Sequence, residues 1–228
     1  MAGSLTYTEL QDYVSLQFGK NTAWETPTNY VGVWVNRAYH QLTTQNIFWA
    51  TGGKRFHFPE LETSSAVSTV DGTAYVAVPT DALFVRDLFD TTSKRYLRNI
   101  PYRRYIEYTD RADTTAEGEP TEWVRAGTSL YLHPTPDAVY SLTRYYRKVP
   151  TALSGGTDVT LIGSEWDLPI ITLAAYIGKV LTMDYEKANF LKKEFAEQVA
   201  GIMSLSGEEE KSQENYLYVD ETYRDRGY

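Results

Sequence analysis

The stretch Val67-Ser68-Thr69-Val70-Asp71-Gly72-Thr73-Ala74-Tyr75-Val76-Ala77-Val78 decides the fold class of this sequence. Val, Thr and Tyr favour β-strands, and Asp-Gly between two such runs is the strongest short-range hairpin signal, because both turn positions need positive φ angles. The stretch therefore predicts two antiparallel strands joined at Asp71-Gly72, in a chain whose two ends have helical periodicity instead.

The sequence before residue 54 predicts two helices. Thr6 and Glu9 stand three residues apart, as in a capping box, and apolar residues follow at helical spacing as far as Phe18. The second helix is predicted over about 29–46. Its single apolar stripe consists of Val31, Trp34, Val35, Ala38 and Leu42.

The sequence after the opening stretch predicts more strands and then two further helices. Strands are expected over 83–89, 94–100, 123–126, 129–133 and 139–149, with a short helix over 101–110. Helical periodicity returns after residue 164, with Pro169 in a first turn. The two apolar stripes comprise Ile170, Leu173, Ala174, Ile177 and Leu181, then Ala188, Leu191, Phe195, Val199 and Ile202. Gly207 is expected to end the last helix.

These patterns predict an α+β fold: an antiparallel four-helix bundle with a β-rich insertion between helices two and three, and an extended C-terminal tail. The expected parts are 1–53 for helices one and two, 54–150 for the insertion, 151–206 for helices three and four, and 207–228 for an acidic, tyrosine-rich tail. The side chains expected to be mostly buried in the bundle are Trp34, Ala38, Leu42, Leu173, Ile177 and Phe195.

Composition excludes several functional classes. The 228 residues include 22 Lys and Arg, 30 Asp and Glu, and no Cys, for a net charge of −8. The absence of cysteine excludes disulfides, thiolate-held metals and cysteine nucleophiles. No apolar run approaches the ~18 residues that cross a bilayer, and the first residues lack the features of a signal peptide. An acidic chain is also a poor default binder of DNA phosphates.

Charge is distributed unevenly along the chain. Residues 94–111 carry a net charge of +4, whereas residues 206–228 carry −4. The basic stretch interleaves tyrosines with arginines that include Arg98, Arg103 and Arg104, as single-strand nucleic-acid binders do. The negative overall charge favours another interpretation, in which the basic stretch lies on a solvated face or contacts an acidic subunit. The 19 tyrosines suit either partner-binding surfaces or a tyrosine-rich sheet.

Catalytic motifs are weak in this sequence. None of His40, His57 and His133 has a second ligand at metal-binding spacing. Glu60 with Glu62 and Glu117 with Glu119 form close carboxylate pairs of the sort that a glycosidase uses, but such pairs are common by chance in polar loops. We expect no catalytic residue, no metal site and no cofactor, and a virion enzyme stays open only as a distant alternative.

Several ordered pieces resemble the adaptor, or head–tail connector, proteins of tailed bacteriophages. The resemblance covers roughly residues 6–203, and the pieces that carry it are Val35–Leu42, Gly118–Trp123, Leu130–Asp137, Arg144–Pro150 and Asp184–Ala188. It implies a structural virion protein that forms a closed ring, usually of twelve copies, beneath the portal. Such a ring receives the tail or nozzle and leaves a channel for DNA. It also implies a place in the neck of the virion, after assembly in the host cytoplasm, and no membrane.

The C-terminal tail is a candidate contact segment. It combines acidic residues with Tyr216, Tyr218 and Tyr223, which a merely solubilising tail does not need. Alone it is expected to be disordered, and alternation over 216–219 would let it add to a sheet edge or lie in a groove of a neighbouring subunit or of the portal. These tyrosines and the three arginines are the expected partner contacts. The alternative function is a nucleic-acid-binding module that uses residues 94–111.

Overall fold

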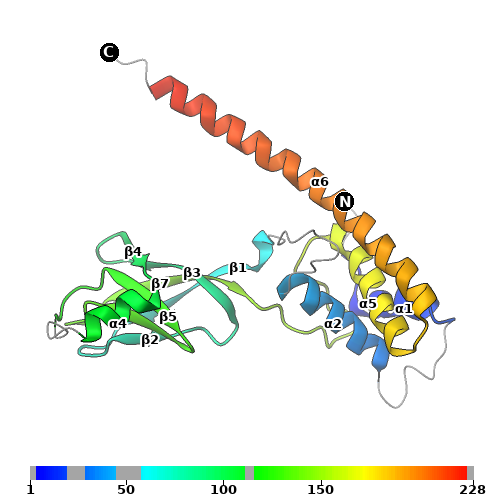
Figure 1. Cartoon of the computed structure of the whole chain (residues 1–228), viewed down its shortest axis with the longest axis horizontal. Coiled ribbons are helices and arrows are strands. Elements are labelled where there is room, and N and C mark those ends of the chain that lie inside the picture. The colour runs from blue at the N-terminus through cyan, green and yellow to red at the C-terminus, as the bar shows by residue number, and fades with distance from the viewer. Residues whose placement is uncertain (1–3, 20–28, 45–57, 111–115, 225–228) are drawn as a thin grey trace. The chain divides into compact units, whose positions relative to one another are not determined.

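The computed structural model describes residues 4–19, 29–44, 58–110 and 116–224, with side chains as far as Ser204 except that of Asp110. The chain divides into two compact units (Figure 1). The helical unit comprises residues 1–57 and 151–228, and the β unit comprises residues 58–150. The α+β class is confirmed, and so is the position of the β-rich segment between the second helix and the next long one.

Four helices pack together in the helical unit, and the third of them is central. They are α1 (Tyr7–Leu16), α2 (Tyr30–Thr44), α5 (Asp167–Leu181) and α6 (Tyr185–Arg224). Helix α5 packs against α1, α2 and α6, and α1 also packs against α2. The six side chains predicted to be buried are at most 7% exposed, which confirms a common interior at these positions. Leu181, the last residue of the stripe predicted for the third helix, is instead 56% exposed.

Polar contacts fix the start of α1 and the segment that precedes α5. The predicted capping box is confirmed: Glu9 N–H donates to Thr6 Oγ1, and Thr6 N–H donates to Glu9 Oε2 at 2.8 Å. On α2, Asn36 Nδ2 donates to the Leu153 carbonyl at 2.9 Å, and Asn36 Oδ1 accepts from Leu153 N–H at 2.7 Å. This amide pairs both backbone groups of a residue outside regular structure, as burial requires.

Gly178 marks the closest approach of α5 to two aromatic rings. A Cβ atom at this position would lie 2.6 Å from Phe18 and 2.7 Å from Trp34, and the Trp34 ring is itself buried. We expect Gly178→Ala to lower the free energy of unfolding by about 1–3 kcal/mol, because these rings have little room to move.

The matched control is Gly201→Ala on α6, where an added Cβ meets nothing within 4 Å. This change removes a helical glycine without a clash, and it should raise the free energy of unfolding by about 0.5–1 kcal/mol. Denaturant midpoints of the two variants test the contrast. Equal shifts in the same direction would contradict tight packing at Gly178.

The last helix is longer than the sequence predicts. Helix α6 continues through Gly207 to Arg224, so the expected stop at Gly207 and the extended tail are both wrong (Figure 1). The residues directly after Gly207, 208–214, are all Glu, Lys, Gln or Ser. Glu, Lys and Gln are good helix formers, and a single glycine costs a helix only about 1 kcal/mol. The helix therefore continues without an apolar stripe like the one that packs on α5.

The β unit contains a curled seven-stranded mixed sheet that forms a half-barrel. Its strands are β1 (Glu62–Ser68), β2 (Tyr75–Ala77), β3 (Ala82–Asp90), β4 (Arg95–Asn99), β5 (Glu122–Ala126), β6 (Ser129–His133) and β7 (Ser141–Lys148). Their order is β1-β7-β3-β4-β5-β6-β2, and only β4 and β5 are parallel. Strands β3 and β4 are antiparallel neighbours, and so are β5 and β6.

The hairpin predicted at Asp71-Gly72 is wrong, although the turn itself is present. Gly72 has a φ of +69°, and Thr73 N–H donates to the Val70 carbonyl at 3.0 Å. The flanking strands pair elsewhere, β1 with β7 and β2 with β6, so they form the two edges of the sheet. Because only a few residues join these edges, the sheet must curl to bring them near each other.

Each face of the curled sheet has its own apolar cluster. One cluster consists of Val76, Leu88, Leu97, Trp123, Leu130, Leu132 and Leu142. The other lies beneath helix α4 (Tyr102–Asp110), where Ile100, Tyr105 and Val124 are buried. Strands β5 and β6 serve both clusters, because successive side chains point to opposite faces.

Candidate partner-contact surface

The four arginines of the basic stretch that the structure describes are paired with carboxylates of the β unit. Arg95 lies 2.8 Å from Glu119, and the exposed Arg103 lies 3.3 Å from Glu107 one helical turn away. Arg98 and Arg104 share Glu122, at 3.8 and 3.6 Å. The parallel register of Arg98 with Glu122 brings two distant parts of the sequence together. This pairing leaves less free positive charge for phosphates than the sequence suggests.

The tyrosines of the same stretch are divided between packing and exposure. Tyr105 is 8% exposed, and its ring centroid lies 5.4 Å from that of Tyr131. Tyr108 stacks on His133 at 4.2 Å and accepts a 2.6 Å hydrogen bond from Arg104 Nε. Burial raises the pKa of Tyr105. These two rings attach α4 to the sheet, so they are unavailable as stacking platforms for bases.

Two exposed tyrosines remain in this stretch. Tyr102 is 51% exposed and stacks against Tyr105, with centroids 6.4 Å apart. Tyr96 is 62% exposed and has an edge contact with Phe89 at 5.0 Å. Tyrosine is enriched at protein–protein interfaces, and the rim of such interfaces is polar. Together with Arg98, Arg103 and Arg104, they define a candidate contact surface on the β unit.

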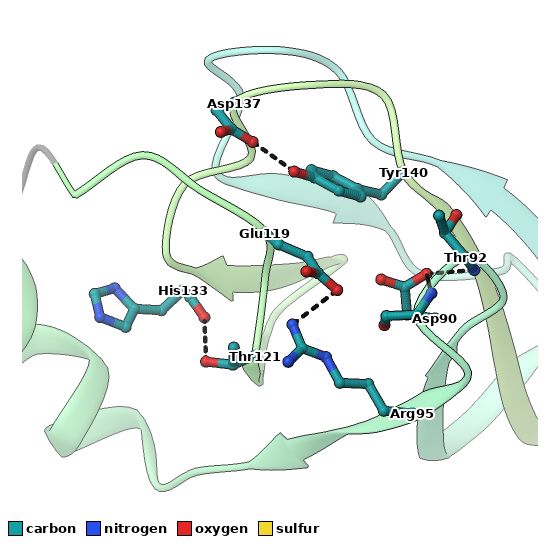
Figure 2. Close-up of polar contacts among 9 residues, drawn as sticks. Asp90, Thr92, Arg95, Glu119, Thr121, His133, Asp137 and Tyr140 are labelled. Carbon is teal, nitrogen blue, oxygen red and sulfur yellow. Dashed lines mark hydrogen bonds and ion pairs between the residues drawn. The ribbon is translucent and has the colours of Figure 1, made fainter.

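A polar cluster that the sequence analysis missed lies around Asp90, Arg95 and Glu119 (Figure 2). Asp90 is fully buried at the end of β3, and its Oδ1 accepts hydrogen bonds from Thr92 N–H at 2.7 Å and Ser93 N–H at 3.3 Å. The signal was an Asp followed by Thr-Thr-Ser, which is typical of an Asx-turn. Figure 2 shows the Asp90 and Glu119 carboxylates beside Arg95.

A third acid in Figure 2, Asp137, interacts with a tyrosine. The Tyr140 hydroxyl donates to Asp137 Oδ1 at 2.6 Å. That hydrogen bond, with a smaller contribution from burial, raises the pKa of Tyr140 to about 12. Thr121 Oγ1 also donates to the His133 carbonyl at 3.4 Å. These contacts fix the loop segments around residues 117–121 and 134–140, and Glu119, the partner of Arg95, projects from the first of them.

The pKa of Asp90 predicts how stability depends on pH. Burial alone would raise this pKa, but the hydrogen bonds from Thr92 and Ser93 outweigh burial and hold the pKa below its ordinary value. An acid with a lowered folded-state pKa stabilises the fold above its unfolded pKa, about 4, and this contribution disappears as pH falls through the folded-state pKa.

We therefore expect Asp90→Asn to be less stable than the native chain at neutral pH, with a difference that shrinks toward about pH 3. Asparagine keeps the Oδ1 acceptor, removes the charge and replaces the buried Oδ2 by an NH2 donor. Urea midpoints measured across this range test the prediction. A stability difference that is the same at every pH would contradict it.

The other candidate residues have ordinary surroundings. Glu62 lies 3.8 Å from Arg86, and Glu119 is paired with Arg95, so one member of each suspected carboxylate pair faces an arginine. His40 Nδ1 lies 3.2 Å from Thr44 Oγ1, and His57 is outside the described residues. In the part of the chain that the structure describes, no group of three His, Cys, Asp or Glu residues could hold a metal ion. No helix there is long and apolar enough to cross a membrane.

The three C-terminal tyrosines lie on a helical backbone. Tyr216, Tyr218 and Tyr223 fall in the last part of α6, and their side chains lie outside the described residues. In a helix, Tyr216 and Tyr223 are seven residues apart and share a face with Val219, whereas Tyr218 is on another face. Helical spacing therefore replaces the alternation that the sequence analysis assumed.

In the β unit, the charged groups described above pair with one another, and exposed tyrosines lie in the same stretch of sequence. A protein-family model described as SU10 adaptor protein matches residues 5–215. The chain belongs to the SU10 adaptor protein family, a family of phage adaptor proteins that is structural rather than catalytic. Comparison with curated proteins gives no match. The match confirms the resemblance and includes the first residues after Gly207.

Proposed function

We propose that this protein forms a ring adaptor between the portal and the tail of a tailed bacteriophage. The observation that carries the proposal is the match to the phage adaptor family over residues 5–215. The ring would contain about twelve identical copies, as the resemblance implies, and would leave a channel through which DNA passes. The protein would reside in the virion neck after assembly in the host cytoplasm. Its partners would be further copies of itself, the portal protein, and tail or nozzle proteins.

The charge distribution supports this role. A ring built from head-to-tail contacts needs two different, complementary patches on each subunit. The stretch around α4 is basic, and the last part of α6 is acidic and tyrosine-rich. With a net charge of −8, the subunit is poorly suited to hold DNA tightly, and a lining that holds DNA weakly allows it to slide.

Electron microscopy of the purified protein mixed with the portal protein from the same genome tests the proposal. The expected result is a ring of subunits at the narrow end of the portal. A protein that stays monomeric in this mixture, or that binds elsewhere on the portal, would exclude the proposed role.

The alternative function is nucleic-acid binding by residues 94–111, and a double variant separates it from the adaptor role. We expect Arg103→Ala with Arg104→Ala to weaken assembly with the portal and to leave DNA affinity unchanged. If these arginines bound phosphates instead, their loss would reduce the slope of DNA affinity against salt by about 2.

The matched control is Arg86→Ala, which removes an exposed, carboxylate-paired arginine outside the basic stretch. It should leave both assembly and DNA affinity unchanged. Normal rings combined with lost DNA affinity in the double variant would favour the nucleic-acid-binding module.

A further inference from the structure

The helical unit has a groove of mixed polar and apolar lining that its own described residues leave open. The groove lies between α2 and α5, has a volume of about 250 Å³, and is lined by Arg37 and Gln41 from α2 and by Ile177, Val180 and Leu181 from α5. Leu181 is 56% exposed and Val180 is 36% exposed. Exposed aliphatic side chains beside a groove are typical of a binding surface.

The apolar surface continues into the turn between α5 and α6. Met183 is 76% exposed and has a φ of +60°, and Tyr185 is 60% exposed. This backbone conformation closes the C-terminal turn of α5, where Asp184 N–H donates to the Lys179 carbonyl at 3.0 Å. The exposed Met183 and Tyr185 side chains add apolar surface at this end of α5.

The groove carries a positive charge at its edge. Arg37 is exposed, and none of the ion pairs seen among the described residues includes it. A groove that combines exposed aliphatic side chains with one arginine fits an aromatic helix that carries negative charge. Helix-in-groove recognition uses side chains at spacings of three, four and seven along such a helix.

The last part of α6 has this composition. Residues 206–228 carry a net charge of −4, and Tyr216, Val219 and Tyr223 follow the spacing of a single helical face. As one continuous helix of 40 residues, α6 is about 60 Å long. Helix α5 has 15 residues, about 22 Å, and α6 starts beside its Leu181 end. A straight α6 therefore carries its last residues away from its own groove.

We propose that the groove between α2 and α5 receives the last part of α6 from a second copy of this chain. The contact joins two different patches, so it repeats from subunit to subunit and closes a ring when the rotation allows. The inference rests on the proposed ring assembly and specifies which surfaces hold neighbouring subunits together.

Engineered cysteines test this contact directly, because the chain has no cysteine of its own. One protein carries Leu181→Cys, and a second, separately tagged protein carries Tyr216→Cys. The control replaces Leu181→Cys with Leu168→Cys, which lies at the opposite end of α5 and is equally exposed at 56%. The proteins are mixed, assembled with the portal and mildly oxidised.

The expected result is a mixed disulfide between the two tagged chains, formed at about tenfold or more the yield of the Leu168→Cys control, because a docked pair reacts at a high effective concentration. Adding Arg37→Glu should lower the yield about two- to fivefold, as expected for a reversed surface ion pair. Lys193→Glu, an equal charge change on the exposed side of α6, should not lower it.

Electron microscopy of the same samples separates the two proposals. Rings seated on the portal with equal yields from Leu181→Cys and Leu168→Cys would overturn the groove contact and leave the adaptor role in place. Cross-links from Tyr216→Cys to the portal alone, or a loss of yield from Lys193→Glu rather than Arg37→Glu, would also overturn the groove contact. The absence of both rings and disulfides would contradict both proposals.

Discussion

Replacing Leu173 or Leu42 with alanine is expected to lower the free energy of unfolding by about 2–5 kcal/mol. Leu173 lies on α5, the helix that contacts all three of the others, and Leu42 lies on α2, which packs against it. Both side chains are 1% exposed. Each truncation removes buried apolar surface and leaves a cavity that closely packed helices fill only in part.

Leu168→Ala is the matched control for this prediction, since it makes the same chemical change on the same helix. Its side chain is 56% exposed, so the free energy of unfolding should change by no more than about 0.5 kcal/mol. Denaturant midpoints, followed by the helical circular-dichroism signal, give the comparison. Midpoints that are unchanged in Leu173→Ala and Leu42→Ala would exclude a shared core of the four helices.

The helical unit could be predicted because its signals are local. Apolar residues at spacings of three and four identify the buried face of a helix from a short window, and the capping box at Thr6 identifies a start. Each helix has to bury that face, so the expectation that the helices pack together follows directly. The central position of α5 was not predicted, although nearly every side of this helix carries apolar residues.

The sheet could be predicted only in part, because strand order depends on contacts between distant residues. Asp71-Gly72 specifies a turn, and a turn does not determine which strands its arms join. Thr69 N–H donates to the Tyr140 carbonyl at 3.0 Å, and Leu132 N–H donates to the Ala74 carbonyl at 2.8 Å. These contacts connect the two arms of the turn to β7 and β6, which come much later in the sequence.

The candidate contact surface could also be predicted only in part from the sequence. Charge counted along residues 94–111 is strongly positive, but Glu119 and Glu122 come from outside that window and pair with its arginines. The tyrosines of α4 suggested stacking on bases, yet Tyr105 and Tyr108 pack on residues of β6. A sequence window contains neither of these partners, so it overstates both the free charge and the free aromatic surface.

Truncation after Ser206 is the change expected to have the largest effect on assembly. The shortened chain keeps the α6 side chains that pack on α5, including Leu191, Phe195 and Val199, which are at most 5% exposed. It should therefore stay folded and soluble as a monomer. It loses the acidic, tyrosine-rich part of α6, and we expect it to fail to close a stable ring or to join the portal.

A full-length variant separates loss of the tyrosines from loss of the helix. Tyr216→Ala, Tyr218→Ala and Tyr223→Ala together keep the charge and the good helix formers while removing the aromatic rings, which are enriched among interface residues that dominate binding energy. If the rings of tyrosine form the contact, this variant should assemble almost as poorly as the truncated chain. Co-sedimentation with the portal and counts of infectious particles measure both effects. Normal yields from the truncated chain would show that the last part of α6 is not an anchor, because assembly would then depend only on surfaces that end before Ser206.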